Sequence, residues 1–274
     1  MRAASQASLS AAAERFETLW QQVGADAAEL GAQVLTFADV VRGSGQLRRA
    51  LTDPAAPGEA KAALVSSLLG SSADGRVVDL LAGVVRSRWS HESDLAEALE
   101  QLGRQAVLAG ADADGALDTV EEDLFRTQRF LVGQRDVREA LTARSTPATA
   151  RAALIRQLFG PAVHPRTLTL LERITHQDDS TAAAGSVSAV AALADAAAER
   201  RARTVAVVTS ATALTREQED RLRSGLARAY GRQVQLNVTV DPAVLGGMRV
   251  QVGPDVIDGT VSARVADARR RLAG

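Results

Sequence analysis

A stretch of 25 residues occurs twice in this chain, and that repeat limits what the chain can fold into. Residues 46–70 read QLRRALTDPAAPGEAKAALVSSLLG, and residues 136–160 read DVREALTARSTPATARAALIRQLFG. The two segments are identical at 11 of 25 positions without a gap, and similar apolar pairs continue on both sides at the same offset of 90 residues. We therefore expect a duplication of about 90 residues, each copy a small bundle of antiparallel helices with short connections.

The repeated segment itself predicts one amphipathic helix per copy. A proline at the first helical position and a glycine just past the end are typical helix bounds. These residues are Pro57 and Gly70 in the first copy, and Pro147 and Gly160 in the second. Apolar residues at i, i+4 and i+8 predict the buried face. They are Ala60, Leu64 and Leu68 in the first copy, and Ala150, Leu154 and Leu158 in the second.

Composition agrees with a helical chain and excludes several classes of function. Alanine is abundant and aromatic residues make up 3% of the chain, which favours closely packed helices. The absence of cysteine removes disulfides and thiolate metal sites. A formal net charge of −1 gives no reason to expect nucleic acid or an anionic membrane as a partner. No signal peptide is expected at the N-terminus, and the longest charge-free stretch is too short to span a bilayer.

The last third of the chain has a different pattern. Thr204–Thr209 is a short β-branched run that predicts a buried strand. Thr215 and Gln218 form a capping box, which starts a helix with Leu222, Leu226 and Tyr230 on one face. Residues 234–240 alternate apolar and polar, which is typical of a strand buried on one side. The order of elements predicts a β-α-β-β-β-α domain.

We therefore expect a mostly α protein with a small α/β domain at its C-terminus. Two tandem helical-bundle modules, residues 1–110 and 111–200, should precede the α/β domain at residues 203–274. The segment from Gly110 to Gly115 should be the joint between the bundles, because glycine and aspartate favour turns. A second flexible stretch is expected at residues 177–187.

Residues 240–274 carry the most specific pattern. Asp-Pro ends a strand, Gly-Gly gives backbone freedom, Met248 to Val252 alternate as a second strand, and Gly-Pro-Asp is turn chemistry. Asp258 or Thr260 can then cap a final amphipathic helix. Truncating a buried residue of these strands, such as Leu236, should cost ~2–5 kcal/mol. The signature positions, which are also candidate partner-binding residues, are Asp241, Pro242, Gly246, Gly247, Gly253, Asp258, Gly259, Thr260 and Arg264.

This pattern resembles the C-terminal signature of the delta subunit of F-type ATP synthases, called the oligomycin-sensitivity-conferring protein in mitochondria. Thr260 stands where serine is commoner in the family, and either hydroxyl can cap a helix. The family usually has one N-terminal helical domain, whereas this chain has two. Lys61 is the only lysine among the 32 basic residues, which indicates a GC-rich genome of actinobacterial type. The duplicated helical module makes the chain resemble a long form of the family.

The resemblance implies a non-catalytic stator subunit of a proton-translocating ATP synthase, with no cofactor. It implies two partners, the N-terminal segments of the alpha subunits and the b-subunit helices of the peripheral stalk. It also implies a peripheral place at the cytoplasmic face of the cell membrane, with membrane contact only through partners. Which helical copy contacts the alpha subunits stays open.

Enzyme chemistry has little support in the sequence. No phosphate-binding loop is present, and the three histidines, His91, His164 and His176, lack metal-ligand spacing. The competing hypothesis is a general helical adaptor whose bundles bind an amphipathic partner helix in a groove. Co-purification with catalytic alpha and beta subunits separates a stator subunit from an adaptor.

Overall fold

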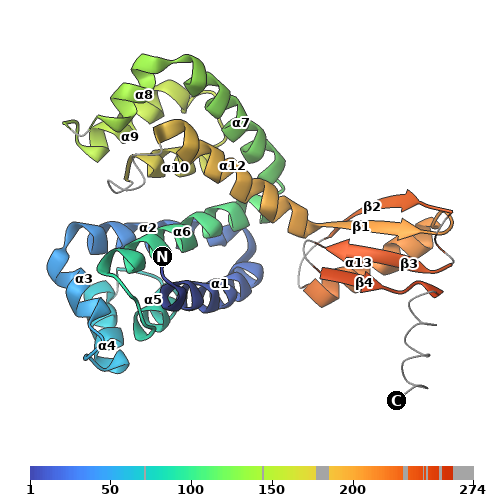
Figure 1. The fold of residues 1–274 in the computed structure, drawn as a ribbon, viewed down its shortest axis with the longest axis horizontal. Coiled ribbons are helices and arrows are strands. Elements are labelled where there is room, and N and C mark those ends of the chain that lie inside the picture. Colours follow the sequence, from blue (N-terminus) through green and yellow to red (C-terminus); the bar gives the residue numbers. More distant parts are fainter. Residues whose placement is uncertain are drawn as a thin grey trace. The chain divides into compact units, whose positions relative to one another are not determined.

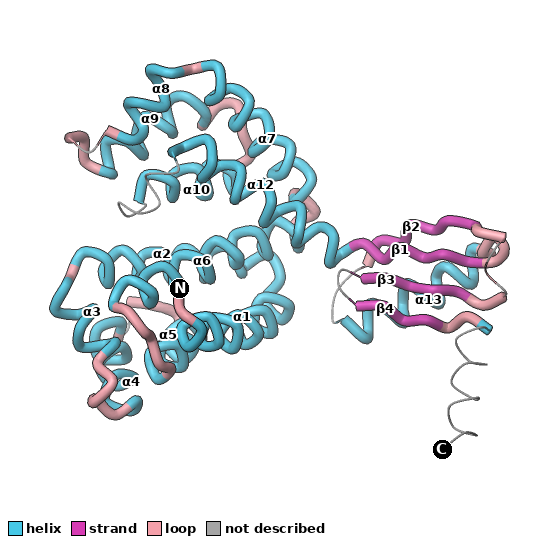
Figure 2. Tube along the Cα trace, in the orientation of Figure 1, coloured by secondary structure: helices cyan, strands magenta, loops and turns pink. Residues whose placement is uncertain are grey.

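The computed structural model describes residues 1–70, 72–143, 145–176, 185–230, 234–242, 244, 246–252 and 255–261 (Figure 1). Contacts divide the chain into two units, Met1–Ala197 and Ala198–Gly274. Helices build the first unit, and the second contains a four-stranded sheet (Figure 2). The prediction of a mostly α chain with a small α/β part at its C-terminus is confirmed.

The helices of the first unit follow one another with short connections. Their bounds are α1 Ala3–Val23, η1 Gly24–Asp26, α2 Ala27–Gly43, α3 Gly45–Thr52, α4 Gly58–Leu69, α5 Gly75–Arg86, α6 Glu92–Ala113, α7 Leu117–Gly133, α8 Arg135–Thr142, α9 Ala148–Phe159, α10 Pro165–Arg173, η2 Ile174–His176 and α12 Gly185–Thr204.

The duplication is visible in these bounds. Adding 90 to the limits of α2, α3 and α4 gives the limits of α7, α8 and α9. At the same offset of 90 residues, α1 corresponds to α6. Helix α6 is the last helix of one module and the first of the next, so the two modules share it. We call α1–α6 module one and α6–α12 module two.

Hydrogen bonds repeat along with the helices. The backbone N–H of Asp74 donates to Gln33 Oε1 at 2.8 Å, and the N–H of His164 donates to Asp123 Oδ2 at 2.7 Å, 90 residues later. Arg48 Nη1 donates to the carbonyls of Val41 and Arg42, which close helix α2. In module two Arg138 Nη1 donates in the same way to the last turn of α7, at 2.6 and 2.7 Å. The duplicated sequence therefore preserves its tertiary contacts as well as its helices.

Two clusters of buried apolar side chains fill the first unit. One lies within module one and includes Phe16, Trp20, Phe37 and many α6 residues. The other is built mainly from module two, but it also contains Leu35 of α2, together with Val107, Leu108 and Ala111 of α6. Helix α6 thus contributes to both cores. The division into domains at 110/111 and 200/203 stays a prediction.

One expectation about the helical part is wrong, and another lies mostly outside the described residues. The segment expected to be a joint is helical as far as Ala113, because Gly110 packs against α2: a Cβ there would lie 2.7 Å from Ala28 Cβ. Its glycine permits a close helix approach and does not break the helix. Residues 177–184 of the second expected flexible stretch lie outside the described residues, and Gly185–Val187 begin α12.

The expected buried face of the repeated helix is also misplaced. Leu68 and Leu158 are exposed, and the residues facing inward in module one are Lys61, Ala62 and Val65. Pro57 and Pro147 are the N-cap residues, one position before the first helical residue. In α4 and α9 leucines lie on two sides of the helix. Packing of α4 against α5 and of α9 against α10 buries the side that does not carry Leu68 or Leu158.

The second unit contains β1 Val205–Ser210, α13 Arg216–Tyr230, β2 Gln235–Val240, β3 Met248–Val252 and β4 Asp255–Asp258. The strand order is β2-β1-β3-β4, in which β1 and β2 are parallel and the other pairs are antiparallel. The capping box is confirmed, since Thr215 N–H donates to Gln218 Oε1 at 2.9 Å and Gln218 N–H donates to Thr215 Oγ1 at 3.3 Å. Leu226 of α13 is buried against Ala206 and Val208 of β1.

Within the described part of the second unit, only one face of the central strand β1 is covered. Val208 is fully buried, whereas Val207 on the other face is 44% exposed, so the prediction of a strand buried on both faces is wrong. Val250 is buried as expected, but Leu236 is only half-buried because β2 is an edge strand. Truncating Leu236 should therefore cost less than the ~2–5 kcal/mol of a fully buried leucine. The last expected helix lies beyond Val261, outside the described residues.

Candidate partner-binding regions

The first half of the C-terminal signature forms the connection between β2 and β3. The N–H of Asp241 donates to the carbonyl of Ser210 at 2.9 Å, and the carbonyl of Asp241 accepts from the N–H of Val244 at 3.1 Å. Pro242 is exposed within this turn, where no ladder N–H is required. These residues end β2 beside the end of β1.

Gly246 and Gly247 lie at a close approach of two backbone segments. Their φ angles are 78° and 82°, in the region that favours glycine. A Cβ on Gly247 would lie 2.5 Å from the carbonyl oxygen of Gly259. The carbonyl of Gly246 accepts from the N–H of Val261 at 3.1 Å, and the N–H of Gly259 donates to the carbonyl of Met248 at 3.0 Å. Both glycines are needed so that residues 259–261 can lie against the start of β3.

Asp258 and Thr260 form the cap at this junction. Asp258 Oδ1 accepts from the backbone N–H of Thr260 at 3.0 Å and from Thr260 Oγ1 at 2.7 Å. These two hydrogen bonds, the side-chain one first, lower the pKa of the Asp258 carboxyl. Thr260 is 7% exposed, so its hydroxyl acts inside the protein. The structure brings Asp241, Gly246, Gly247, Asp258, Gly259 and Thr260 into the connections around β3, while Gly253 and Arg264 lie outside the described residues.

A second polar cluster, which the sequence did not reveal, joins the two modules. Arg173 of α10 donates from Nη1 and Nη2 to Asp39 of α2, at 2.7 and 2.8 Å, and from Nε to Glu100 of α6 at 3.0 Å. Arg42 of α2 lies 3.1 Å from Asp39 and 3.3 Å from Glu100. His176 Nδ1 lies 3.2 Å from Asp39 Oδ1. We call these five residues the intermodule charge cluster.

The charges of this cluster stabilise one another. Burial raises the pKa of Asp39, but hydrogen bonds to His176 and Arg173 outweigh it and hold that pKa far below its ordinary value. Burial also raises the pKa of Glu100, and the hydrogen bonds from Arg173 again produce a net lowering. Burial lowers the pKa of Arg173, and its two carboxylate partners raise it well above the usual value. Asp39, Glu100 and Arg173 are therefore charged at neutral pH, and their ion pairs link α2 and α6 to α10.

Exposed apolar side chains recur at equivalent positions of the two modules. Val40 and Leu68 of module one are each 50% exposed, and their counterparts Phe130 and Leu158 are 44% and 40% exposed. Phe130 also meets Phe159 edge to face, at a ring distance of 5.6 Å. Such residues are available for contacts with other chains.

None of the histidines takes part in a metal-ligand group among the described residues. His91 is exposed before α6, His164 Nδ1 accepts from the N–H of Arg166 at the start of α10, and His176 belongs to the intermodule charge cluster. Across the described part of the chain, no helix is both long and apolar enough to cross a membrane.

Comparisons with known proteins agree with the signature. The family described as ATP synthase delta (OSCP) subunit matches residues 104–272. "ATP synthase subunit delta" of Beutenbergia cavernae is 47% identical over 274 residues, covering all of both chains. The protein of the same name from Streptomyces griseus is 43% identical over 274 residues, again covering all of both chains. A chain in the Toxoplasma gondii mitochondrial ATP synthase hexamer is 16% identical over 62% of this chain and 95% of its own, at a TM-score of 0.34, which is too low to establish a shared fold.

Fold and contacts thus define a mostly helical chain with two helical modules and a small α/β unit, and the family match makes it a non-catalytic subunit. The chain belongs to the ATP synthase delta (OSCP) subunit family. It is a stator subunit of an F-type ATP synthase, and it has the long N-terminal region of its actinobacterial relatives.

Proposed function

We propose that this chain holds the catalytic head of the enzyme to its peripheral stalk. In this proposal the helical unit binds the N-terminal segments of the alpha subunits, and the α/β unit binds the b-subunit helices. The observation that carries it is the division into two units with separate cores, which gives each partner its own surface. Two linked contacts also hold far more tightly than either one alone. In this proposal the chain is a peripheral protein at the cytoplasmic face of the membrane, and it contacts the membrane only through its partner subunits.

Within the helical unit we assign the alpha contact to module one. Its first helix, α1, belongs to one module only and has a broad exposed face that includes Ala7 and Ala11. The equivalent first helix of module two is α6, which contributes buried side chains to both cores. A partner helix that packs on the first helix of a module therefore has more free surface in module one.

Surface substitutions in the full chain test this assignment. Placing arginine at Ala7 and Ala11 should abolish binding of an alpha N-terminal peptide, because two bulky charges would occupy the contact face of α1. The matched control is Ala153→Arg on the exposed face of α9 in module two. Isothermal titration calorimetry should show unchanged binding for the control. Binding lost only in the control would move the contact to module two.

Removal of residues 262–274 tests the stalk contact. This deletion keeps Asp258, Thr260 and Val261, whose hydrogen bonds close the signature junction. Binding to b-subunit helices should be lost, while the alpha peptide binds as before. Full-strength binding to b would place the stalk contact on another surface. Co-purification with alpha and beta subunits separates this function from that of a general helical adaptor.

A further inference from the structure

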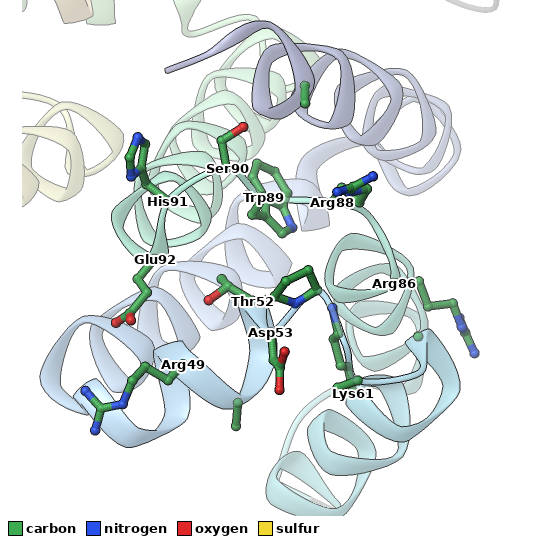
Figure 3. Close-up of a pocket in the computed structure, with 15 residues that line it drawn as sticks. Arg49, Thr52, Asp53, Lys61, Arg86, Arg88, Trp89, Ser90, His91 and Glu92 are labelled. Atoms are coloured by element: carbon green, nitrogen blue, oxygen red, sulfur yellow. The ribbon is translucent and has the colours of Figure 1, made fainter.

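A cavity of about 770 Å³ lies in module one, where α3, the start of α4 and the connection between α5 and α6 meet (Figure 3). Its lining includes Arg49, Asp53, Lys61, Arg88, Trp89 and Glu92. This volume falls within the range of small-molecule sites, roughly 300–1,000 Å³. The cavity is separate from the signature junction and from the intermodule charge cluster.

Lys61 is the unusual residue of this cavity. It is the only lysine of the chain and is 6% exposed. In Figure 3 its side chain extends from α4 toward Trp89, into the middle of the lining residues. Within the described part of the chain the Lys61 side chain makes no hydrogen bond or ion pair, although its backbone N–H donates to the carbonyl of Pro57 at 3.3 Å. Its Nζ is not among the fully buried polar atoms without a partner, so the hydrocarbon part of the side chain is buried while the ammonium faces the open cavity.

In module two the residue at the same position donates hydrogen bonds inside the protein. Arg151 is the equivalent of Lys61, 90 residues later. Arg151 Nη1 donates to the carbonyl of Ala143 at 2.9 Å, and Nη2 donates to the carbonyl of Thr175 at 2.6 Å. The lysine in module one makes no equivalent bonds. Its charge remains directed into the cavity.

The surroundings of Lys61 also favour an anion. Helix α4 begins at Gly58, which lines the cavity, and its N-cap residue Pro57 provides no side-chain hydrogen bond. The start of a helix carries partial positive charge and free N–H groups. Arg49 and Arg88 add two more cations.

The acidic groups near the cavity do not cancel this charge. Glu59 is engaged by Arg86, in a two-point ion pair at 2.9 and 3.0 Å. Asp53 accepts from the N–H of Ala55 at 2.8 Å, and Glu92 is exposed in the first turn of α6. With Asp53 and Glu92 set against Lys61, Arg49 and Arg88, the lining keeps a net positive charge.

We propose that this cavity binds a phosphate group, either free phosphate or the phosphate of a small metabolite, with the Lys61 ammonium as its main counter-charge. Lysine and a helix N-terminus are both common phosphate ligands. Phosphate binding can be measured on the isolated chain. The test is therefore independent of the proposed contacts with the alpha and b subunits.

The single lysine makes the test direct. In protein labelled with ¹³C at lysine Cε, one side-chain signal reports on Lys61. Inorganic phosphate should shift that signal saturably, and chloride at the same ionic strength should not. AMP is the second arm: tighter binding of AMP than of phosphate assigns the site to a metabolite, and equal binding assigns it to the phosphate group alone. If neither phosphate nor AMP shifts the lysine signal saturably, the proposal is overturned.

Two variants provide a matched pair. Phosphate should raise the melting temperature of the wild-type chain and of Arg151→Met, whose substitution lies in module two. The Lys61→Met variant should show no rise, and it should remain folded because methionine keeps the buried apolar part of the side chain. A phosphate-induced rise that survives in Lys61→Met would contradict the proposal. The lysine signal of the wild-type protein decides the matter if either variant does not fold.

Discussion

Modules one and two have the same framework and different charges. Their helices match at a constant offset, and the same hydrogen bonds close α2 and α7. Yet Asp39 corresponds to Arg129, and Arg173 corresponds to Gly83. Asp39 therefore lies in module one alone and Arg173 in module two alone, while Glu100 lies on the shared helix α6. The comparison teaches that packing was kept after duplication, while side chains that contact something outside the module were free to diverge.

Removing Arg173 should have the largest effect on this comparison. The Arg173→Met variant leaves Glu100, whose side chain is 8% exposed, without its buried partner. We expect the free energy of unfolding to fall by about 3–5 kcal/mol, measured by urea denaturation. The control is Arg156→Met, since Arg156 pairs with Glu172 on the surface and its side chain is 61% exposed. That variant should lose less than about 1 kcal/mol, and equal losses would show that the cluster does not join the modules.

Truncating the equivalent leucines tests whether the cores are alike. Leu51 and Leu141 occupy matching positions and are 0% and 3% exposed. Each substitution by alanine should lower the free energy of unfolding by about 3 kcal/mol. Because the modules share α6, each variant should still unfold in one transition by circular dichroism. Two separate transitions, or a loss confined to one variant, would show that the modules are energetically independent.

Acid should weaken the contact between the modules. The pKa values of Asp39 and Glu100 are lowered in the folded state, so their stabilisation is present above the unfolded carboxyl pKa of about 4 and is lost as the pH falls below it. The free energy of unfolding of the wild-type chain should therefore fall as the pH drops from about 4.5. In Arg173→Met this fall should be smaller. An unchanged pH dependence would place the acid-sensitive groups elsewhere.

The smallest expected difference lies at two matching helix caps. Asp74 Oδ1 accepts from the N–H of Arg76 at 2.9 Å at the start of α5, and His164 Nδ1 accepts from Arg166 at 3.3 Å at the start of α10. Asp74→Ala should cost about 1 kcal/mol. His164→Ala should cost less, because its hydrogen bond is longer and an imidazole is not a typical cap. Thermal melting of both variants measures the difference.

Local signals in the sequence predicted much of this fold. The repeat, the Thr215 capping box and the Gly-Gly pair each depend on residues close in the chain, and the structure has the helices, the cap and the positive φ angles in place. The failures come from contacts between distant residues. Gly110 is typical of a turn by itself, and only its contact with Ala28 explains why the helix continues.

The candidate site was harder to predict for the same reason. Arg173 is 134 residues from Asp39 and 73 from Glu100, and no local pattern links them. The exposure of Val207 depends on α13 covering only one face of the sheet. Lys61 could have been noticed as the only lysine at a position that is arginine in the repeat, but its burial required the structure.

The arrangement of the intermodule charge cluster also limits self-assembly. In this contact a surface of module one meets a different surface of module two. Head-to-tail contacts of this kind can extend into open filaments when every added unit again exposes the surface that receives the next one. Here the face that would receive the next subunit carries exposed Arg129 in place of Asp39 and Val132 in place of Arg42. An incoming Arg173 would meet a like charge. Module two therefore does not offer the charges that a further module would need to repeat this contact.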